Sequence, residues 1–564
     1  MSSDGPLEPL PYSVRSELTR SHAPVREARA RGEHEVAVRL AVRAASEILT
    51  KFGSSDDLMT PALRVVHREA YAHVDAAIDT ASTHHLLPHF VNIAHQLTVM
   101  VDGFPSDHLL APAVYAEANE RVGRLYDVLD RTASSPHLDT IIDSGAAIGR
   151  RCQRLPDAAR SAVSSVHAPA AIWAERRAAL AARRGAPRER ATALQHAAEA
   201  WVLVPNFERA WFNASNALAS TTDDDLEGHA SAMYSAARAA RGDTRHRAEV
   251  GNHLRAVYER LTQEARERVG ISLGRAWFEL GQPRRAVQAF RDAYHRHHPV
   301  PYAAATDVAY LRALRQAGAL REARRLHHER DTAPVDALPT RTPLERMWLV
   351  HEYGLATLAS GRHDDGLRLL LRALGEYVDL EDVPYAQLQG RNPVEDFVET
   401  AILLNELDLA HDGILEVEYR IKELSDMLQR GDLYLWRGDI EHAGGSDRSN
   451  SRGRWEDALA AYQVATFGTE GDQLLRMGEA WRRLDPATAV EPLEQAAATF
   501  ISEGRLERAA TTHRVLGETL LAGGDRAGAV LAFQRAVTTF GSVGENHRAF
   551  VGAVRADAVA RDLS

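Results

Sequence analysis

The sequence predicts an all-α protein in which helix hairpins stack one on another as an α-solenoid. Apolar residues recur at three- and four-residue spacing through most of the 564 residues, and alanine, leucine, arginine and glutamate dominate the composition. Short turns interrupt these stretches, and each puts a glycine where a helix end needs left-handed backbone. The turn glycines are Gly32, Gly281, Gly318, Gly361, Gly504 and Gly524. Alternating runs typical of strands are absent from the sequence.

The hairpins repeat with a fixed period near the C-terminus. A shift of 40 residues superposes Ala489 on Ala529, Val490 on Val530, Leu493 on Phe533, Ala496 on Ala536, Phe500 on Phe540, Gly504 on Gly544 and Ala509 on Ala549. Matches of alanine and glycine could partly reflect composition, but the paired phenylalanines and the order of the matches indicate a repeat. Self-similarity at a fixed period of this length is typical of stacked helical units.

The spacing within one unit resembles the tetratricopeptide repeat (TPR) family. Three segments carry the resemblance: Gly274-x2-Trp277-x3-Gly281-x4-Ala286-x3-Phe290-x2-Ala293, Gly354-x2-Thr357-x3-Gly361-x4-Gly366-x3-Leu370-x2-Ala373 and Gly517-x2-Leu520-x3-Gly524-x4-Ala529-x3-Phe533-x2-Ala536. Small residues let two helices approach closely, and the large residue fills the gap beside them. The resemblance implies a right-handed α-solenoid with a concave groove that the first helix of each hairpin lines.

Four regions are expected along the chain. Residues 1–165 form a less regular helical region, whose part from residue 52 is either degenerate repeats or a separate helical domain. Residues 166–330 form a first TPR-like array, in which the register breaks between Asp243 and Gly270 because the spacing is too short for a full repeat. A proline-rich linker over 331–343 separates it from a second array over 344–564.

The second array carries an insertion. One repeat begins at Gly431 and is completed from Gly453 onward, and the polar residues 439–452 lie between its two halves. This spacing predicts an inserted, mobile surface loop, which is either tolerated or in contact with a partner.

Charge and residue usage exclude several function classes. Lys51 and Lys422 are the only lysines, and neither follows a glycine-rich loop, so a P-loop nucleotidase is excluded. The net charge is −11, but residues 238–330 hold 19 arginines and 10 acids, whereas residues 376–426 hold 14 acids and 3 bases. Such asymmetry guides partners, joins parts of one molecule, or only reflects solvated faces of opposite sign.

The single cysteine and the apolar runs bear on location. Cys152 rules out an intramolecular disulfide, and it is either a structural residue or a reactive thiol beside Arg150 and Arg151. No secretion signal opens the chain, and no apolar run reaches the length of a membrane span. We therefore expect a cytoplasmic protein that does not cross a membrane.

The search for chemistry yields no catalytic signature. His84, His85, His89 and His95 cluster in the N-terminal region and would be the ligands of a metal-dependent enzyme, but no H-E-x-x-H motif accompanies them. Carboxylate pairs such as Glu395 and Glu399 are common on acidic helices and are not a catalytic signal. No convincing helix-turn-helix appears, which argues against nucleic-acid binding. No cofactor is expected.

The TPR resemblance implies that first-helix residues bind the partner. These groove residues are Arg209, Phe212 and Asn216 near Trp211, Asn252 in the weaker unit around Gly251, and Arg268, Ile271, Arg275 and Phe278 near Trp277, with Arg514, Glu518 and Leu521 near Leu520. Asparagine and arginine hold peptide amides or carboxylates by directed hydrogen bonds. The carboxylate clamp of some TPR proteins needs a lysine where Phe212 stands, which puts that ligand in doubt.

The leading hypothesis is a non-catalytic TPR scaffold or adaptor that binds a protein or peptide in its groove. The alternative is a regulatory protein that responds to a small ligand or peptide and acts through protein contacts. A metal-dependent enzyme that uses the N-terminal histidines is the third hypothesis. The identity of the partner, the pathway and the oligomeric state do not follow from the sequence.

Overall fold

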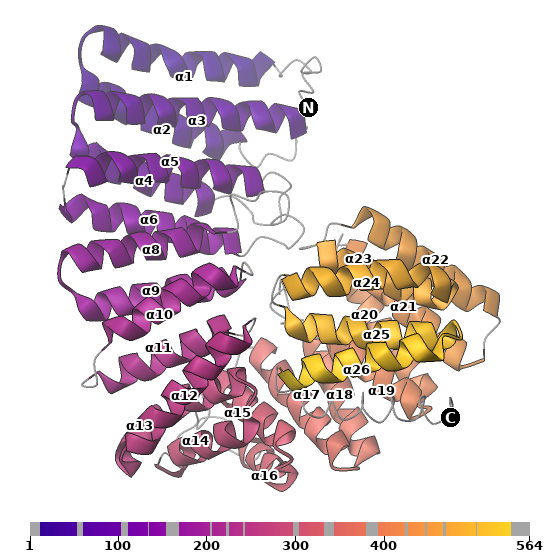
Figure 1. Cartoon of the computed structure of the whole chain (residues 1–564). Helices are drawn as coiled ribbons and strands as arrows, with labels where there is room; N and C mark the ends of the chain where they lie inside the picture. Colours follow the sequence, from indigo (N-terminus) through magenta and orange to yellow (C-terminus); the bar gives the residue numbers. More distant parts are fainter. Residues whose placement is uncertain are drawn as a thin grey trace. The chain divides into compact units, whose positions relative to one another are not determined.

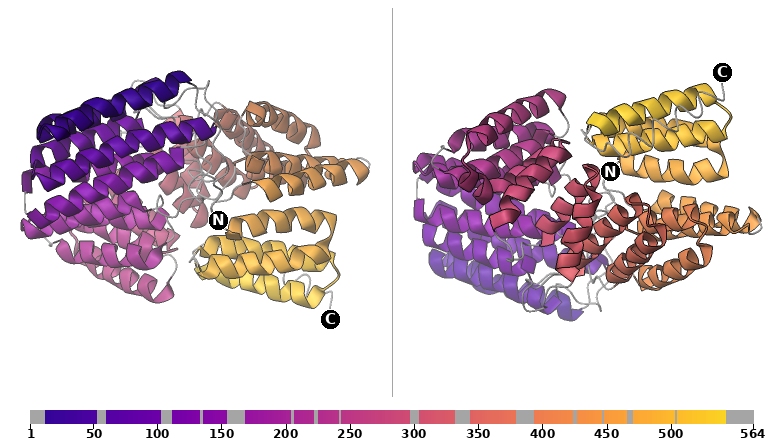
Figure 2. Two further views of the ribbon diagram at one scale, coloured as in Figure 1. Left: turned by 90° about the horizontal axis from the view of Figure 1, so that it is seen from above. Right: turned by 90° about the horizontal axis from the view of Figure 1, so that it is seen from below.

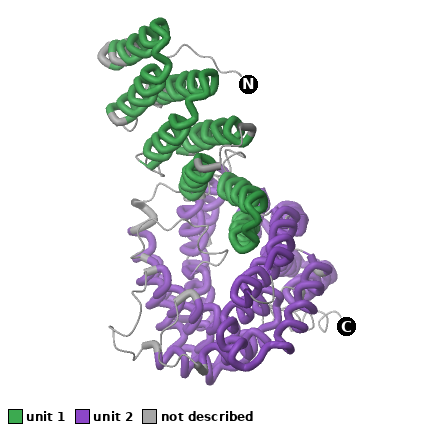
Figure 3. The backbone as a smooth tube through the Cα atoms, turned by 90° about the vertical axis from the view of Figure 1, so that its left-hand side faces the viewer, with its two compact units in different colours: residues 1–200 green, residues 201–564 purple. Residues whose placement is uncertain are grey.

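The computed structural model is all-helical in the residues that it describes. These are residues 12–52, 60–102, 111–132, 135–153, 168–203, 206–221, 225–240, 243–296, 304–331, 343–378, 393–423, 427–445, 448–465, 470–502 and 505–542. They form 25 helices and contain no strand, which confirms the predicted fold class (Figure 1). Within them, no helix is long and apolar enough to span a membrane. The chain divides into two compact units, residues 1–200 and 201–564 (Figure 3).

Unit 1 is a series of helix hairpins. Its helices are α1 (Tyr12–Ala30), α2 (His34–Phe52), α3 (Thr60–Thr83), α4 (Leu87–Asp102), α5 (Ala111–Thr132), α6 (Ser135–Gln153), α8 (Pro169–Arg183) and α9 (Pro187–Leu203), the last of which ends just beyond the unit boundary. Pro88 lies in the first turn of α4, where its missing N–H costs nothing.

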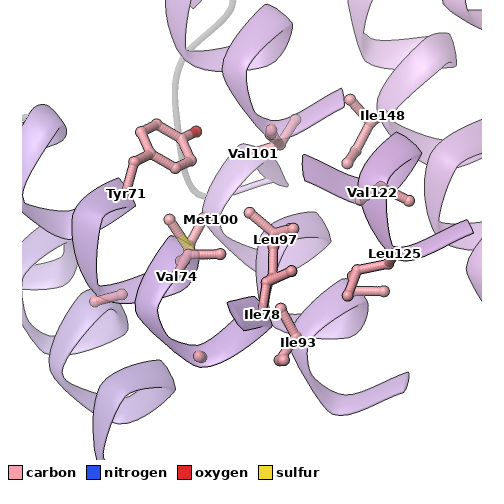
Figure 4. Packing of buried hydrophobic residues seen from close by; sticks show 14 of the residues in the cluster. Tyr71, Val74, Ile78, Ile93, Leu97, Met100, Val101, Val122, Leu125 and Ile148 are labelled. Atoms are coloured by element: carbon pink, nitrogen blue, oxygen red, sulfur yellow. The ribbon is translucent and has the colours of Figure 1, made fainter. Parts of the chain in front are cut away.

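One continuous apolar core joins α1 to α8 of unit 1. Figure 4 shows part of it, where Ile78 of α3, Leu97 of α4 and Leu125 of α5 lie close together. Cys152 is 1% exposed in the same core, and burial raises the pKa of its thiol to about 12. A protonated, buried thiol is unreactive, so Cys152 has a structural role.

Residues 60–153 continue the stack of hairpins. Trp173 of α8 packs against α6, where a Cβ added to Gly145 would lie 2.0 Å from the indole ring. The indole N–H of Trp173 also donates to Asn119 Oδ1 of α5 over 2.8 Å. Helix α8 therefore packs against α5 and α6 across the expected boundary at residue 165. Whether this region is degenerate repeats or a separate helical domain stays a prediction.

Unit 2 continues with hairpins of more uniform length. Its helices are α10 (Phe207–Ser220), α11 (Leu226–Ala239), α12 (Thr244–Arg260), α13 (Gln263–Glu279), α14 (Pro283–Arg296), α15 (Ala304–Gln316), α16 (Leu320–Asp331), α17 (Pro343–Ala359), α18 (His363–Val378), α19 (Pro393–Leu403), α20 (Leu407–Glu423), α21 (Met427–Ala443), α22 (Arg448–Val464), α23 (Glu470–Leu484), α24 (Pro486–Ser502), α25 (Leu506–Ala522) and α26 (Arg526–Ser542). Figure 2 shows the last of them, in yellow, lying side by side.

Side-chain caps fix where several of these helices begin. Asn206 Oδ1 accepts from the N–H of Arg209, and Asp225 and Asp243 cap α11 and α12 in the same way. Thr262 Oγ1 caps α13. Each cap satisfies an amide at a helix start that has no partner within the helix.

Close contact between glycine and a large ring holds the two helices of a hairpin together. A Cβ added to Gly431 of α21 would lie 2.4 Å from the ring of Tyr462 in α22, and one on Gly517 of α25 would lie 2.8 Å from Phe533 in α26. The spacing of small and large residues in the sequence thus has the predicted role in packing. The 40-residue shift carries the bounds of α24 onto those of α26.

The predicted glycine turns join the hairpin helices. Left-handed backbone, with φ between 70° and 87°, occurs at Gly32, Gly281, Gly318, Gly361 and Gly524, whereas Gly504 lies outside the described residues. Two further turns use His85, with φ 54°, and Asn405, with φ 59°.

The register break predicted after Asp243 corresponds to a single extra helix. Helix α13 packs directly on α11, so α12 between them has no hairpin partner. The ring of His246 in α12 stacks on Trp211 of α10 with centroids 4.1 Å apart. Tyr258 of α12 donates to Asp292 of α14.

The expectation of an inserted loop over residues 439–452 is wrong for most of that segment. Residues 439–443 extend α21 and residues 448–452 begin α22, and only the tip between them is not helical in the described residues. Helices α21 and α22 pair with each other here, because the indole N–H of Trp455 donates to Asp439 over 3.1 Å and Arg454 lies 3.4 Å from Glu441. The proline-rich linker lies outside the described residues except at its ends, and its flanking helices α16 and α17 both belong to unit 2.

Substitution of Gly431 by alanine tests the helix contact. The new methyl group meets the ring of Tyr462, which is fully buried, so we expect Gly431→Ala to destabilise the hairpin by about 1–3 kcal/mol. Gly453→Ala in α22 is the matched control, because nothing lies within 4 Å of its added Cβ, and helix propensity should stabilise it by up to about 1 kcal/mol. Hydrogen exchange of the α21 and α22 amides measures both effects. Equal protection in the two variants would contradict the packing described.

Candidate functional site

The predicted groove residues of α10 are partly exposed. Phe212 is 66% exposed, and the guanidinium of Arg209 lies 4.2 Å from the centre of the Trp201 ring. Asn216 is half-buried, and its side-chain amide donates to the carbonyl of Phe212 over 2.8 Å. Asn252 is exposed on α12, the extra helix that packs against α10 through His246 and Trp211.

The two predicted arginines of α13 bind neighbouring helices. Arg268 lies 2.8 Å from Glu227 of α11, and Arg275 donates to Thr306 of α15 over 2.8 Å. Both side chains therefore have a role in joining successive hairpins. Whether they also bind a partner stays a prediction.

In the last five hairpins of the described residues, charged side chains join α17 to α19, α21 to α23 and α23 to α25. His351 of α17 lies 2.9 Å from Asp396 of α19, and Arg476 of α23 lies 3.2 Å from Asp432 of α21. Arg482 of α23 lies 3.2 Å from Glu518 of α25. We call this surface of α17, α19, α21, α23 and α25 the inner face.

Side chains of α19 and α25 come within reach of each other on the inner face. Glu399 of α19 lies 3.9 Å from Arg514 of α25, although the two helices are three hairpins apart. Glu399 nevertheless keeps 60% of its side chain exposed. Solvent therefore reaches a place that helices from separate hairpins surround, as expected of a concave surface.

A buried network fixes Arg476 in this face. Asp432 is 1% exposed, accepts from the hydroxyl of Tyr462 over 2.7 Å and pairs with Arg476. Arg476 also donates to Glu479 over 3.2 Å. Burial works against ionisation of Glu479, but Arg476 and the other arginines nearby lower its pKa.

The carboxylates of α19 are less well compensated. Burial raises the pKa of Glu395 to about 7, and the nearby Arg476 offsets only part of that effect. The carboxylates of Glu479 and Glu399 add to the rise. Glu399 lies near Arg514 and keeps most of its side chain exposed. At neutral pH a large share of the molecules therefore carries Glu395 in its protonated form, because Arg476 does not fully offset the effect of burial.

The sequence prediction includes Arg514 and Glu518, which lie in α25 and pair with each other, and Glu518 also pairs with Arg482 of α23. Whether Arg514 and Glu518 bind a partner stays a prediction. The sequence prediction treated Glu395 and Glu399 as ordinary surface carboxylates. A usable signal was available, because both belong to the most acidic stretch of the chain and fall on one face of a helix, four residues apart.

The histidine-rich part of unit 1 has another arrangement. His84 stacks on His34 with centroids 3.4 Å apart, and His89 lies 3.3 Å from Glu35. His89 and His95 line a cleft of about 370 Å³ between α2 and α4. Among the described residues, no three or more histidine, cysteine or acidic side chains come together as metal ligands.

Comparison with known proteins adds little beyond helical repeats. The model of the soluble NSF attachment protein (SNAP) family matches residues 455–552, less than a fifth of the chain. No curated protein sequence matches the chain. A Rap protein, whose crystal structure contains competence and sporulation factor, is 11% identical, with 66% of this chain and 99% of that chain covered and a TM-score of 0.31. The APC/C hetero-tetramer Cut9-Hcn1 is 11% identical, with 97% and 99% covered and a TM-score of 0.26. TM-scores this low carry no conclusion on function.

Glu395→Gln tests the electrostatics of the inner face. The folded state binds the Glu395 proton more tightly than the unfolded chain, so stability is lost as the pH rises from the ordinary value of 4.5 through about 7. Glutamine does not ionise, and we expect the variant to have a higher melting temperature than the wild type at pH 8 and a similar one at pH 4.5. Thermal unfolding at the two pH values measures this, with the exposed Glu491→Gln as control. An equal shift at both pH values would show that Glu395 is not desolvated.

Asp432→Ala tests the buried network. The substitution leaves Arg476 and Tyr462 without their shared partner, so we expect a loss of about 3–5 kcal/mol in the free energy of unfolding. Glu456→Ala removes the exposed pair with Arg452 in the same hairpin and should cost less than about 0.5 kcal/mol. Urea denaturation of both variants measures these losses in the free energy of unfolding. Similar losses in the two variants would contradict a buried ion pair at Asp432.

Proposed function

We propose that this chain is a non-catalytic, TPR-like scaffold or adaptor that binds a protein or peptide on its inner face. The single observation that supports this most is the meeting of α19 and α25, where Glu399 stays exposed beside Arg514. Side chains that buried ion pairs already hold in place form directed hydrogen bonds without a further loss of conformational entropy on binding. A cytoplasmic location belongs to the same proposal.

The excess of carboxylates on α19 favours a partner segment with cationic side chains. A lysine or arginine of the partner would neutralise Glu395 and Glu399, and its binding would favour the ionised form of both. Arg209, Phe212, Asn216, Asn252, Arg268 and Arg275 extend the proposed surface towards the first hairpins of unit 2. Exposed Phe212 would add apolar contact there.

A regulatory role is the second candidate, and the contact between α19 and α25 favours it. A ligand that binds between these helices would change how the hairpins of the array are spaced. The array would then present a different surface to a second protein.

Affinity capture with variants of the full chain tests the proposed function. We expect Glu395→Lys with Glu399→Lys to lose a partner that the wild type retains, because the charge of the inner face is reversed. Glu491→Lys with Glu494→Lys on α24 is the matched control and should retain it, since both residues are exposed on a second helix. Circular dichroism verifies that each variant folds.

A third variant separates the two parts of the surface. Asn216→Ala with Asn252→Ala and Arg275→Ala alters only the α10–α13 part. Loss of the partner in this variant alone would move the site away from α19 and α25. Unchanged partners in every variant would reject the inner face as the binding surface.

A further inference from the structure

The second helices of three consecutive hairpins, α16, α18 and α20, have exposed faces of different charge. On α16, Arg321, Arg324 and Arg325 are exposed at a spacing that puts them in one stripe. Arg325 lies 3.7 Å from Glu329 of its own helix. The outer face of the array is therefore strongly basic at α16.

Helix α20 has the opposite charge and also exposes apolar side chains. Asp408, Asp412 and Glu416 follow one another at four-residue spacing, and all three are exposed. In the row beside them, Leu415 is 45% exposed and Tyr419 is 75% exposed. A large aromatic ring beside a row of carboxylates is a surface that a cationic partner would cover.

Helix α18, the second helix of the hairpin between them, has both signs. Asp364, Arg368 and Arg372 are exposed and follow one another at four-residue spacing. If two copies of α18 lie antiparallel across a two-fold axis midway between Asp364 and Arg368, Asp364 of each copy faces Arg368 of the other. Under that two-fold axis, the basic α16 of one copy lies opposite the acidic α20 of the other, and the two mixed α18 helices lie opposite each other.

We propose that the outer face of α16, α18 and α20 is a dimer interface between two copies of this chain. The arginines of α16 in one copy pair with Asp408, Asp412 and Glu416 of α20 in the other copy, and a two-fold axis makes the same contact twice. Guanidinium groups form paired hydrogen bonds with carboxylates and also stack on aromatic rings, so Tyr419 and Leu415 are covered at the same time.

A second copy of this chain fits the surface because the charges are complementary, with the basic stripe of α16 opposite the acidic row of α20. The interface uses the second helices of the hairpins and leaves the inner face free. Its failure would therefore not affect the proposed function.

Analytical ultracentrifugation of the full chain tests the dimer. We expect a dimer in about 0.05 M NaCl whose dissociation constant rises at least about tenfold in about 0.5 M NaCl, because salt screens the exposed pairs. The basic-face variant (Arg321→Glu, Arg324→Glu and Arg325→Glu) should be monomeric. The acidic-face variant (Asp408→Arg, Asp412→Arg and Glu416→Arg) should be monomeric as well.

Mixing the two variants gives the decisive result. The basic-face variant has only acidic stripes and the acidic-face variant only basic ones, so an equimolar mixture should form a heterodimer. Restored association also shows that both variants fold. Glu491→Arg with Glu494→Arg on α24 is the control and should dimerise like the wild type. A monomeric wild type at about 100 μM and low salt, or a dimer that neither reversal weakens, would overturn the proposal.

Discussion

The close approach of the two helices in each hairpin is the constraint on which the rest of unit 2 depends. Gly431, Gly471 and Gly517 each face the ring of an aromatic side chain in the second helix, at a distance that excludes a Cβ. The ring fills the space that another side chain would occupy, which fixes the thickness of the hairpin. Hairpins of equal thickness stack at a regular period, and one side of each first helix remains for other contacts.

Those contacts are electrostatic on the inner face. Arg476 and Asp432 are almost fully buried, and such charges are tolerated only because each has a partner with good geometry. Arg476 compensates Glu395 only in part, and burial raises the pKa of Glu395. A cationic side chain of the proposed partner would stabilise the ionised form of Glu395. Scaffold and binding surface thus arise from one arrangement, in which the helices that hold the array together also present its ionisable groups.

Contacts within one hairpin could be predicted from the sequence, whereas contacts between distant hairpins could not. Glycine turns and the glycine–aromatic spacing act within one hairpin, so the repeat reveals them. Turns at His85 and Asn405 lack glycine and were missed, because these residues adopt left-handed backbone less readily than glycine. Most of the polar residues 439–452 belong to the end of α21 and the start of α22 instead of forming a loop. The meeting of Glu399 with Arg514 depends on small rotations added over three hairpins, which no single repeat encodes.

Cysteine cross-linking measures most directly whether residues of α19 and α25 lie close together on the inner face. In the full chain, Glu399→Cys with Arg514→Cys introduces two thiols, while native Cys152 stays buried and protonated. The account predicts rapid intramolecular cross-linking of this pair by mild oxidation or a short bifunctional maleimide, identified by peptide mass spectrometry. Glu399→Cys with Glu494→Cys on α24 serves as the comparison pair. Cross-linking of residues 399 and 514 no faster than that of the comparison pair would contradict the account.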